Sequence, residues 1–278
     1  MRHGVTLTLI VLFSLLLGSC AVDTRPVVIL YTYHSDPPFY LPGENNDLSR
    51  EWVRRFNQWQ QRIKLELVHI ERSALNRIVD NGAPYIILWA NPLWFDFRDN
   101  ALRASAPIFW DADIVVSHPN HPVEYHTPSD LTGLRLGTRD GFFYKGLNPL
   151  IDSEQLTRID TEQDSDNYVR LHQGDIDAFI MTRASLLYWR THQPQLNELS
   201  VAAMPHDAYS RHVLVSEGYR RWLPLFNAFI SDCAASSQWQ SQLHYWGVEE
   251  LLNPFELELD ELMELDADND TDAPVSQH

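Results

Sequence analysis

Histidine and carboxylate side chains gather at one place in the middle of the chain. They are His118, His121, Glu124 and His126, an H-x2-H-x2-E-x-H pattern whose ring nitrogens and carboxylate are ligands that zinc accepts. Pro119 and Pro122 lie inside the pattern and hold the backbone extended, which does not suit a compact four-ligand site. We therefore expect an exposed polar loop here, and we assign no metal and no cofactor to the chain.

Alternating aspartates near the C-terminus suggest calcium as a second possibility. Asp266, Asp268, Asp270 and Asp272 have the spacing of the first ligands in a calcium-binding loop. However, Thr271 stands where such a loop needs glycine, and Gln277 where it needs a bidentate glutamate. A solvated acidic tail is the better interpretation.

Common enzyme motifs are missing from the sequence. It contains no Gly-x-Ser-x-Gly, His-Glu-x-x-His, phosphate-binding P-loop or Gly-x-Gly-x-x-Gly. We therefore expect a binding protein and not an enzyme.

The composition indicates a globular and acidic protein. The chain has 278 residues, 44% of them hydrophobic, and a formal net charge of −17. Such a charge repels nucleic acid phosphates, so we expect no nucleic-acid partner. Nine of the acids fall between residues 256 and 272, so most of the excess charge serves solubility. The 9 Trp, 11 Tyr and 12 Phe favour a cleft with aromatic walls.

The N-terminus has the features of an export signal. An apolar run at residues 5–17 is shorter than the roughly 20 residues that a membrane span needs. Gly18, Ser19 and Cys20 follow it and resemble the lipobox of bacterial lipoproteins, which implies lipidation of Cys20 and a membrane anchor. Ordinary cleavage that leaves a free Cys20 is the alternative. Lipidation implies a periplasmic location, and Ala21 after the cysteine favours the outer membrane in a Gram-negative cell. Cys233 is the only other cysteine, so we expect no disulfide within the mature chain.

Strand and helix patterns alternate along the mature chain. The apolar runs 27–33, 65–70 and 85–90 predict strands, and the spacing in 47–63 and 73–81 predicts helices between them. A second block has expected strands at 114–116, 134–138 and 176–181, a helical turn at 140–141, and helices at 165–172 and 183–191. A strand at 212–215 precedes a long helical region from 222 to 246. The alternation predicts two α/β blocks joined by two extended crossings, near 113–117 and 210–216.

Four segments, in order, resemble the solute-binding proteins of polar amino acid ABC importers, which form family 3 of that class. They are Pro37-Pro38-Phe39 with Gly43 and Asp47-Leu48; Arg98 with Ala104-Ser105-Ala106-Pro107; residues 130–137 with Gly141; and Gly174-Asp175-Ile176-Asp177-Ala178-Phe179. The resemblance implies an α/β fold of two lobes, each a β-sheet flanked by helices, joined by two hinge strands. It divides the chain into a signal peptide (1–19), a tether (20–26), lobe I (27–113 plus 216–255), lobe II (114–215) and an acidic tail (256–278).

The resemblance also implies a site between the lobes. Arg98, seven residues before Ser105, would hold the anionic group of a solute, and amides at a helix start after Gly141 would assist it. The family's ammonium-binding aspartate falls on Thr182, which leaves a plain α-amino acid in doubt. The other expected ligand-binding residues are Tyr33, Asp36, Asn91, Trp94, Phe142 and Phe143. They suggest an aromatic or amino-acid-like solute with one anionic group, although core packing is an equal alternative for each ring.

Two other functions stay open. A lipoprotein that signals to a membrane sensor would look the same as one that serves an importer permease. A dehydratase-like enzyme would need an acid/base group such as Asp36 or His34 beside Arg98.

Overall fold

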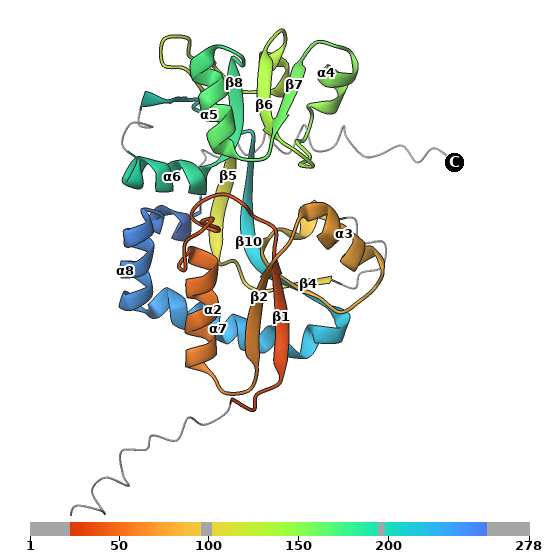
Figure 1. The fold of residues 1–278 in the computed structure, drawn as a ribbon, viewed down its shortest axis with the longest axis vertical. Coiled ribbons are helices and arrows are strands. Elements are labelled where there is room, and N and C mark those ends of the chain that lie inside the picture. Colours follow the sequence, from red (N-terminus) through yellow and green to blue (C-terminus); the bar gives the residue numbers. More distant parts are fainter. Residues whose placement is uncertain (1–22, 96–101, 194–197, 255–278) are drawn as a thin grey trace, which may run out of the picture.

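The computed structural model describes residues 23–95, 102–193 and 198–254. Figure 1 shows two α/β bodies, one above the other, with two long strands running between them. We call the body that contains the N-terminal strands lobe I and the other lobe II. Arg98, Cys20 and the acidic tail lie outside the described residues. No helix in the described part has the length and apolarity needed to cross a bilayer.

Lobe I is built on three parallel strands. Strand β1 (Val27–Thr32) lies between β2 (Lys64–His69) and β3 (Ile86–Ala90). Helices α2 (Leu48–Trp59) and α3 (Arg72–Asp80) connect these strands, and the short strand β4 (Leu102–Ala104) pairs with β10 (Asp207–Ser216). Asp47 caps α2 by accepting a hydrogen bond from the Arg50 amide at 2.7 Å, as expected for an aspartate before a helix.

Lobe II repeats this arrangement. Strand β6 (Arg135–Arg139) lies between β7 (Thr157–Thr161) and β8 (Ala178–Thr182), parallel to both. Its helices are α4 (Asn148–Asp152), α5 (Asp164–Gln173) and α6 (Arg183–His192), and β9 (Ser200–Val201) pairs with β5.

Strands β5 (Phe109–Ser117) and β10 (Asp207–Ser216) join the lobes. The first half of β10 pairs antiparallel with β5, and its second half pairs with β3 and β4 of lobe I. The second half of β5 pairs with β8 of lobe II. The predicted fold class, two α/β lobes with two connecting strands, is therefore confirmed.

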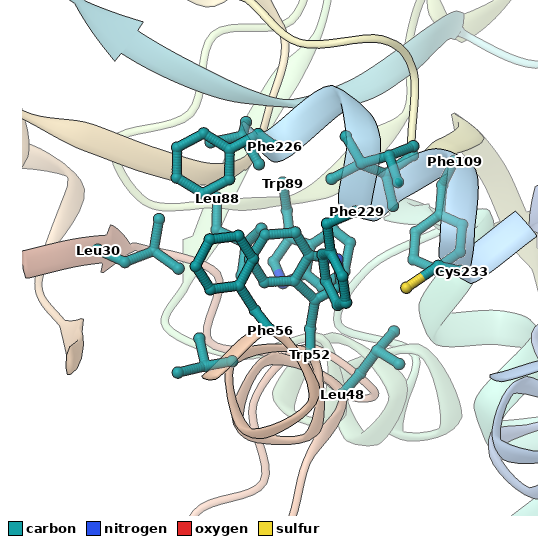
Figure 2. Packing of buried hydrophobic residues seen from close by; sticks show 14 of the residues in the cluster. Leu30, Leu48, Trp52, Phe56, Leu88, Trp89, Phe109, Phe226, Phe229 and Cys233 are labelled. Carbon is teal, nitrogen blue, oxygen red and sulfur yellow. The ribbon is translucent and has the colours of Figure 1, made fainter. Parts of the chain in front are cut away.

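The core of lobe I is rich in aromatic rings (Figure 2). Trp52 and Phe56 come from α2 and meet Phe229 of α7 (Leu223–Ala235) edge-on, with centroids 5.0 and 5.2 Å apart. Trp89 of β3 lies on Phe109 of β5 at 5.1 Å. All five side chains are at most 1% exposed, so truncation of any one to alanine should cost about 3–5 kcal/mol. This packing gives the hinge strands a rigid base.

Three local expectations need correction. The helical region 222–246 is divided, because Ser236 ends α7 and caps α8 (Ser237–Trp246) through its side chain. Strand β7 has no apolar run and was missed by the sequence pattern. No helix begins directly after Gly141, since α4 starts only at Asn148. The Phe142 amide instead donates to the Arg139 carbonyl at 3.2 Å in a turn, so it is not free to bind an anion.

Candidate functional site

A cavity of about 560 Å³ lies between the lobes, with walls from both lobes and from both hinge strands. This volume suits a small metabolite. Six charged side chains line it: Asp36, Arg72, Asp113, Arg139, Asp164 and Arg211.

Arg211 is a permanent positive charge at the hinge end of the cavity. Its side chain is fully buried, and its Nε donates to Asp111 Oδ2 at 2.7 Å, where the carboxylate is also fully buried. A second nitrogen donates to the Trp89 carbonyl at 3.0 Å, and the guanidinium faces the rings of Phe39 and Tyr209 at 4.6 and 5.2 Å. Asp111 neutralises this charge, so Arg211 is held too firmly to reorganise around a solute.

Arg139 of β6 reaches across the gap between the lobes. Its guanidinium pairs with Asp36 of lobe I and donates to the hydroxyl of Ser35. Asp164, the first residue of α5, lies 3.8 Å from the same guanidinium, and its amide donates to Asp36 Oδ1 at 3.2 Å. Burial and the negative charge of Asp36 raise the pKa of Asp164 well above its usual value. One arginine thus lies between two carboxyls, one from each lobe.

Arg72 lies in the first turn of α3 and differs from the other two arginines. No carboxylate contacts it within the described residues. Its guanidinium covers the rings of Tyr33 and Phe95, at 4.8 and 4.3 Å, and donates to the Trp94 carbonyl at 2.5 Å. A half-buried guanidinium without a counter-ion at the wall of a cavity is suited to bind an anion.

Asp113 of β5 accepts a hydrogen bond from the Tyr209 hydroxyl on β10 at 2.8 Å. Removal from water raises the pKa of Asp113 to about 7, although the Tyr209 hydroxyl acts in the opposite direction. The carboxyl is therefore poised between its charged and neutral forms near neutrality.

Seven of the expected ligand-binding residues lie in the described part, and the cavity brings six of them together. Tyr33, Asp36, Trp94, Phe142, Phe143 and Thr182 line it. Asn91 does not line the cavity: its side chain accepts from the Leu93 amide and donates to the Ser210 carbonyl, each at 2.9 Å. The Thr182 hydroxyl is engaged by Ser185 at the start of α6. Phe143 is 73% exposed and lies at the rim.

The acid/base alternative lacks support in the described geometry. Asp36 is occupied by Arg139. His34 is buried beside Arg211 and the Trp89 carbonyl, and burial lowers its pKa well below the usual value. The expected partner, Arg98, lies outside the described residues.

The histidine cluster does not form a metal site. Within the described ranges, no group of three or more His, Cys, Asp or Glu side chains could hold a metal ion. The ring centroids of His118 and His121 are 6.3 Å apart, and His126 Nδ1 instead lies 3.9 Å from Asp130 Oδ2.

Sequence reasoning missed Arg72, Asp113, Arg139, Asp164, Tyr209 and Arg211, all of which line the cavity. One usable signal was present on the hinge strands. Asp111 and Asp113 interrupt an apolar strand, and Arg211 precedes another, and a charge in a buried strand needs a partner or a function. Arg72 and Arg139 carry no comparable signal, because each is an isolated arginine at the end of an element.

Solved structures share this arrangement, although no family model and no curated protein matches the sequence. The GluR0 ligand-binding core from Nostoc punctiforme in complex with L-glutamate has a TM-score of 0.63 at 15% identity, over 80% of this chain and 99% of that chain. Holo ArgBP from T. maritima has a TM-score of 0.57 at 14% identity, over 79% of this chain and 95% of that chain. The ancestral amino acid-binding protein AncCDT-1, a precursor of cyclohexadienyl dehydratase, has a TM-score of 0.61 at 11% identity, over 79% of this chain and 95% of that chain.

These similarities establish the class of fold. The chain has the two-lobed α/β fold of the periplasmic binding proteins, with its cavity at the junction of the lobes.

Proposed function

We propose that the chain is an extracytoplasmic solute-binding protein that encloses a small polar solute between its lobes. The observation that carries this proposal is the half-buried Arg72 at the wall of a cavity, without a carboxylate partner among the described residues. It would hold an anionic group of the solute, together with Arg98, whose role rests on the sequence resemblance alone. The rings of Tyr33, Trp94 and Phe142 provide an apolar wall for the rest of the solute.

Capture would depend on movement of the lobes. Several contacts cross between them, among them Arg139 with Asp36 and Ser35, the Ser185 hydroxyl donating to the Pro37 carbonyl at 2.7 Å, and Arg183 with Glu250 at 2.6 Å. A solute can enter only if these contacts open, and bending of β5 and β10 would allow this. A bound solute that contacts both lobes would then favour the closed state.

Delivery to the permease of an ABC importer is the role that we favour. The structural neighbours include the substrate binding protein of an amino acid ABC transporter, which supports import. In this proposal Cys20 carries a lipid that tethers the protein to a membrane facing the periplasm, the outer membrane in a Gram-negative cell.

A thermal-shift screen of amino acids, organic acids and amines, followed by calorimetry, tests the proposal. Arg72→Ala should weaken the binding of anionic solutes by about 2–4 kcal/mol, because a desolvated anion loses its counter-charge. Arg98→Ala should have a similar effect. Arg77→Ala is the matched control, since Arg77 is exposed on the same helix and outside the cavity wall. Equal affinity of the Arg72→Ala variant and the wild type would refute the role of Arg72, and the absence of any stabilising solute would refute the function.

A further inference from the structure

We infer that the hinge end of the cavity is a cation subsite formed by Asp113, and that the solute carries an ammonium or guanidinium group that binds there. This inference rests on the proposed solute-binding function and adds a substrate class to it: solutes with a positively charged nitrogen.

Asp113 differs from the other carboxyls of the site in the partner that its side chain contacts. Asp36 and Asp164 share Arg139, and Asp111 is paired with Arg211. Within residues 23–95, 102–193 and 198–254, Asp113 makes one side-chain hydrogen bond, and it is to a neutral group, the Tyr209 hydroxyl. Of the three aspartates in the cavity wall, it is therefore the one without a direct arginine contact in the described part.

The surroundings of Asp113 do not supply the missing positive charge. Arg211 is the nearest cation, but Asp111 already neutralises it at 2.7 Å. The Thr182 side chain, opposite Asp113 in the pairing of β5 with β8, is uncharged and hydrogen-bonded to Ser185. The charged and titratable groups that face Asp113 from the surrounding elements are Tyr33, Asp111, Tyr144, Asp164, Asp207, Tyr209 and Arg211.

A partly buried carboxyl in this environment has two ways to avoid an unpaired charge: it retains a proton, or it meets a cation. Without a cationic solute, Asp113 follows the first way in part, since its pKa of about 7 leaves it partly protonated at neutral pH. A cationic solute supplies the second way and displaces the proton. Binding of a cation below pH 7 therefore releases a proton, and affinity rises with pH until Asp113 is fully ionised above pH 7.

The test uses the mature wild-type protein and probes that differ in charge. L-Phenylalanine carries both charges, 2-phenylethylamine only the cation, and 3-phenylpropionate only the anion; L-arginine and agmatine extend the series to guanidinium groups. Each probe, at about 10 mM, is screened by thermal shift, and those that bind are titrated by calorimetry at pH 5.5 to 8 in buffers of different ionisation enthalpy. We expect probes with a cation to bind with release of about one proton at pH 6 and about tenfold weaker affinity for each pH unit below 7.

Two variants and one control isolate Asp113. Asp113→Asn should abolish proton release and weaken the cationic probes about tenfold or more, while 3-phenylpropionate keeps its affinity. Tyr209→Phe retains the carboxyl but removes the donor that lowers its pKa, so the pH midpoint should move upward. Asp140→Asn removes an exposed charge next to Arg139, outside the cavity wall, and should leave both properties unchanged. Circular dichroism confirms that each variant is folded, and Tyr209→Phe decides the question if Asp113→Asn is not.

The outcomes separate this inference from the proposed function. Binding of 3-phenylpropionate alone, or cation binding that is unchanged in Asp113→Asn, overturns the cation subsite and leaves a solute-binding protein. Binding of none of the probes overturns the cation subsite, and the proposed function as well if the wider solute screen is also negative.

Discussion

The ion pair between Arg211 and Asp111 should be the most sensitive charge interaction in the protein. Both side chains are fully buried, and the guanidinium is enclosed by Phe39, Tyr209 and the Trp89 carbonyl. Asp111→Asn keeps the shape and an acceptor for the amides of residues 112 and 184, but it leaves the Arg211 charge without compensation. Removal of one partner of a buried pair costs about 3–5 kcal/mol.

Urea unfolding followed by tryptophan fluorescence and circular dichroism measures this loss. With an m-value of about 2–3 kcal/mol/M for a chain of this size, a loss of about 4 kcal/mol lowers the unfolding midpoint by roughly 1.3–2 M. The double variant Asp111→Asn with Arg211→Met removes both charges. It should be more stable than the sum of the two single variants predicts, by about 2–3 kcal/mol.

A surface pair provides the matched control. Arg135 and Asp177 are also an Arg–Asp pair at 2.7 Å, but their side chains are 43% and 35% exposed. Asp177→Asn should cost no more than about 1 kcal/mol, because water screens the pair. If Asp111→Asn costs no more than this control, or if the double variant shows no coupling, the argument that burial makes the hinge pair strong is refuted.

Two further outcomes follow from the packing and the titration of single residues. Gly137→Ala should destabilise lobe II by several kcal/mol in urea unfolding, since the added methyl would lie 2.5 Å from the Asn167 side chain and 2.8 Å from Phe179; an unchanged midpoint would contradict this. The free energy of unfolding of the ligand-free protein should fall as pH rises from about 4 to about 7, and Asp113 should account for up to about 4 kcal/mol of this loss. The reason is that the folded carboxyl retains a proton that the unfolded one releases. Asp113→Asn should remove this contribution from melting curves recorded at different pH values.

The sequence predicted the layout of the fold better than the chemistry of the site. Period and composition define β1, α2 and β3 because each buries a continuous apolar face. Strand β7 was not predicted because it lies partly exposed at the edge of the sheet, where pairing with β6 does not require apolar residues. The helix break at Ser236 was not predicted, because a serine between helical segments can either cap a new helix or continue the old one. Packing decides between the two.

The pairing of the charged residues in the site could not be predicted, for a different reason. Arg139 and Asp36 are 103 positions apart, and Arg211 and Asp111 are 100 apart. Their pairing depends on how the lobes and the hinge strands meet, which no local pattern encodes. The aromatic wall was easier to predict, because Tyr33, Trp94 and Phe142 lie close to strand or turn ends that α/β folds direct toward a cleft.

The placement of Asp113, Tyr209 and Arg211 on the two strands that join the lobes has a consequence for signalling. Groups at the axis of a bending motion move little, so a solute contacts them almost equally in the open and the closed forms. Such contacts increase affinity without changing the balance between the forms, since only contacts that differ between two states shift their populations. Arg72 and Arg139 lie on opposite lobes and separate when the lobes open. Affinity and the closed shape that a membrane partner would detect are therefore governed by different residues, and mutation could alter one without the other.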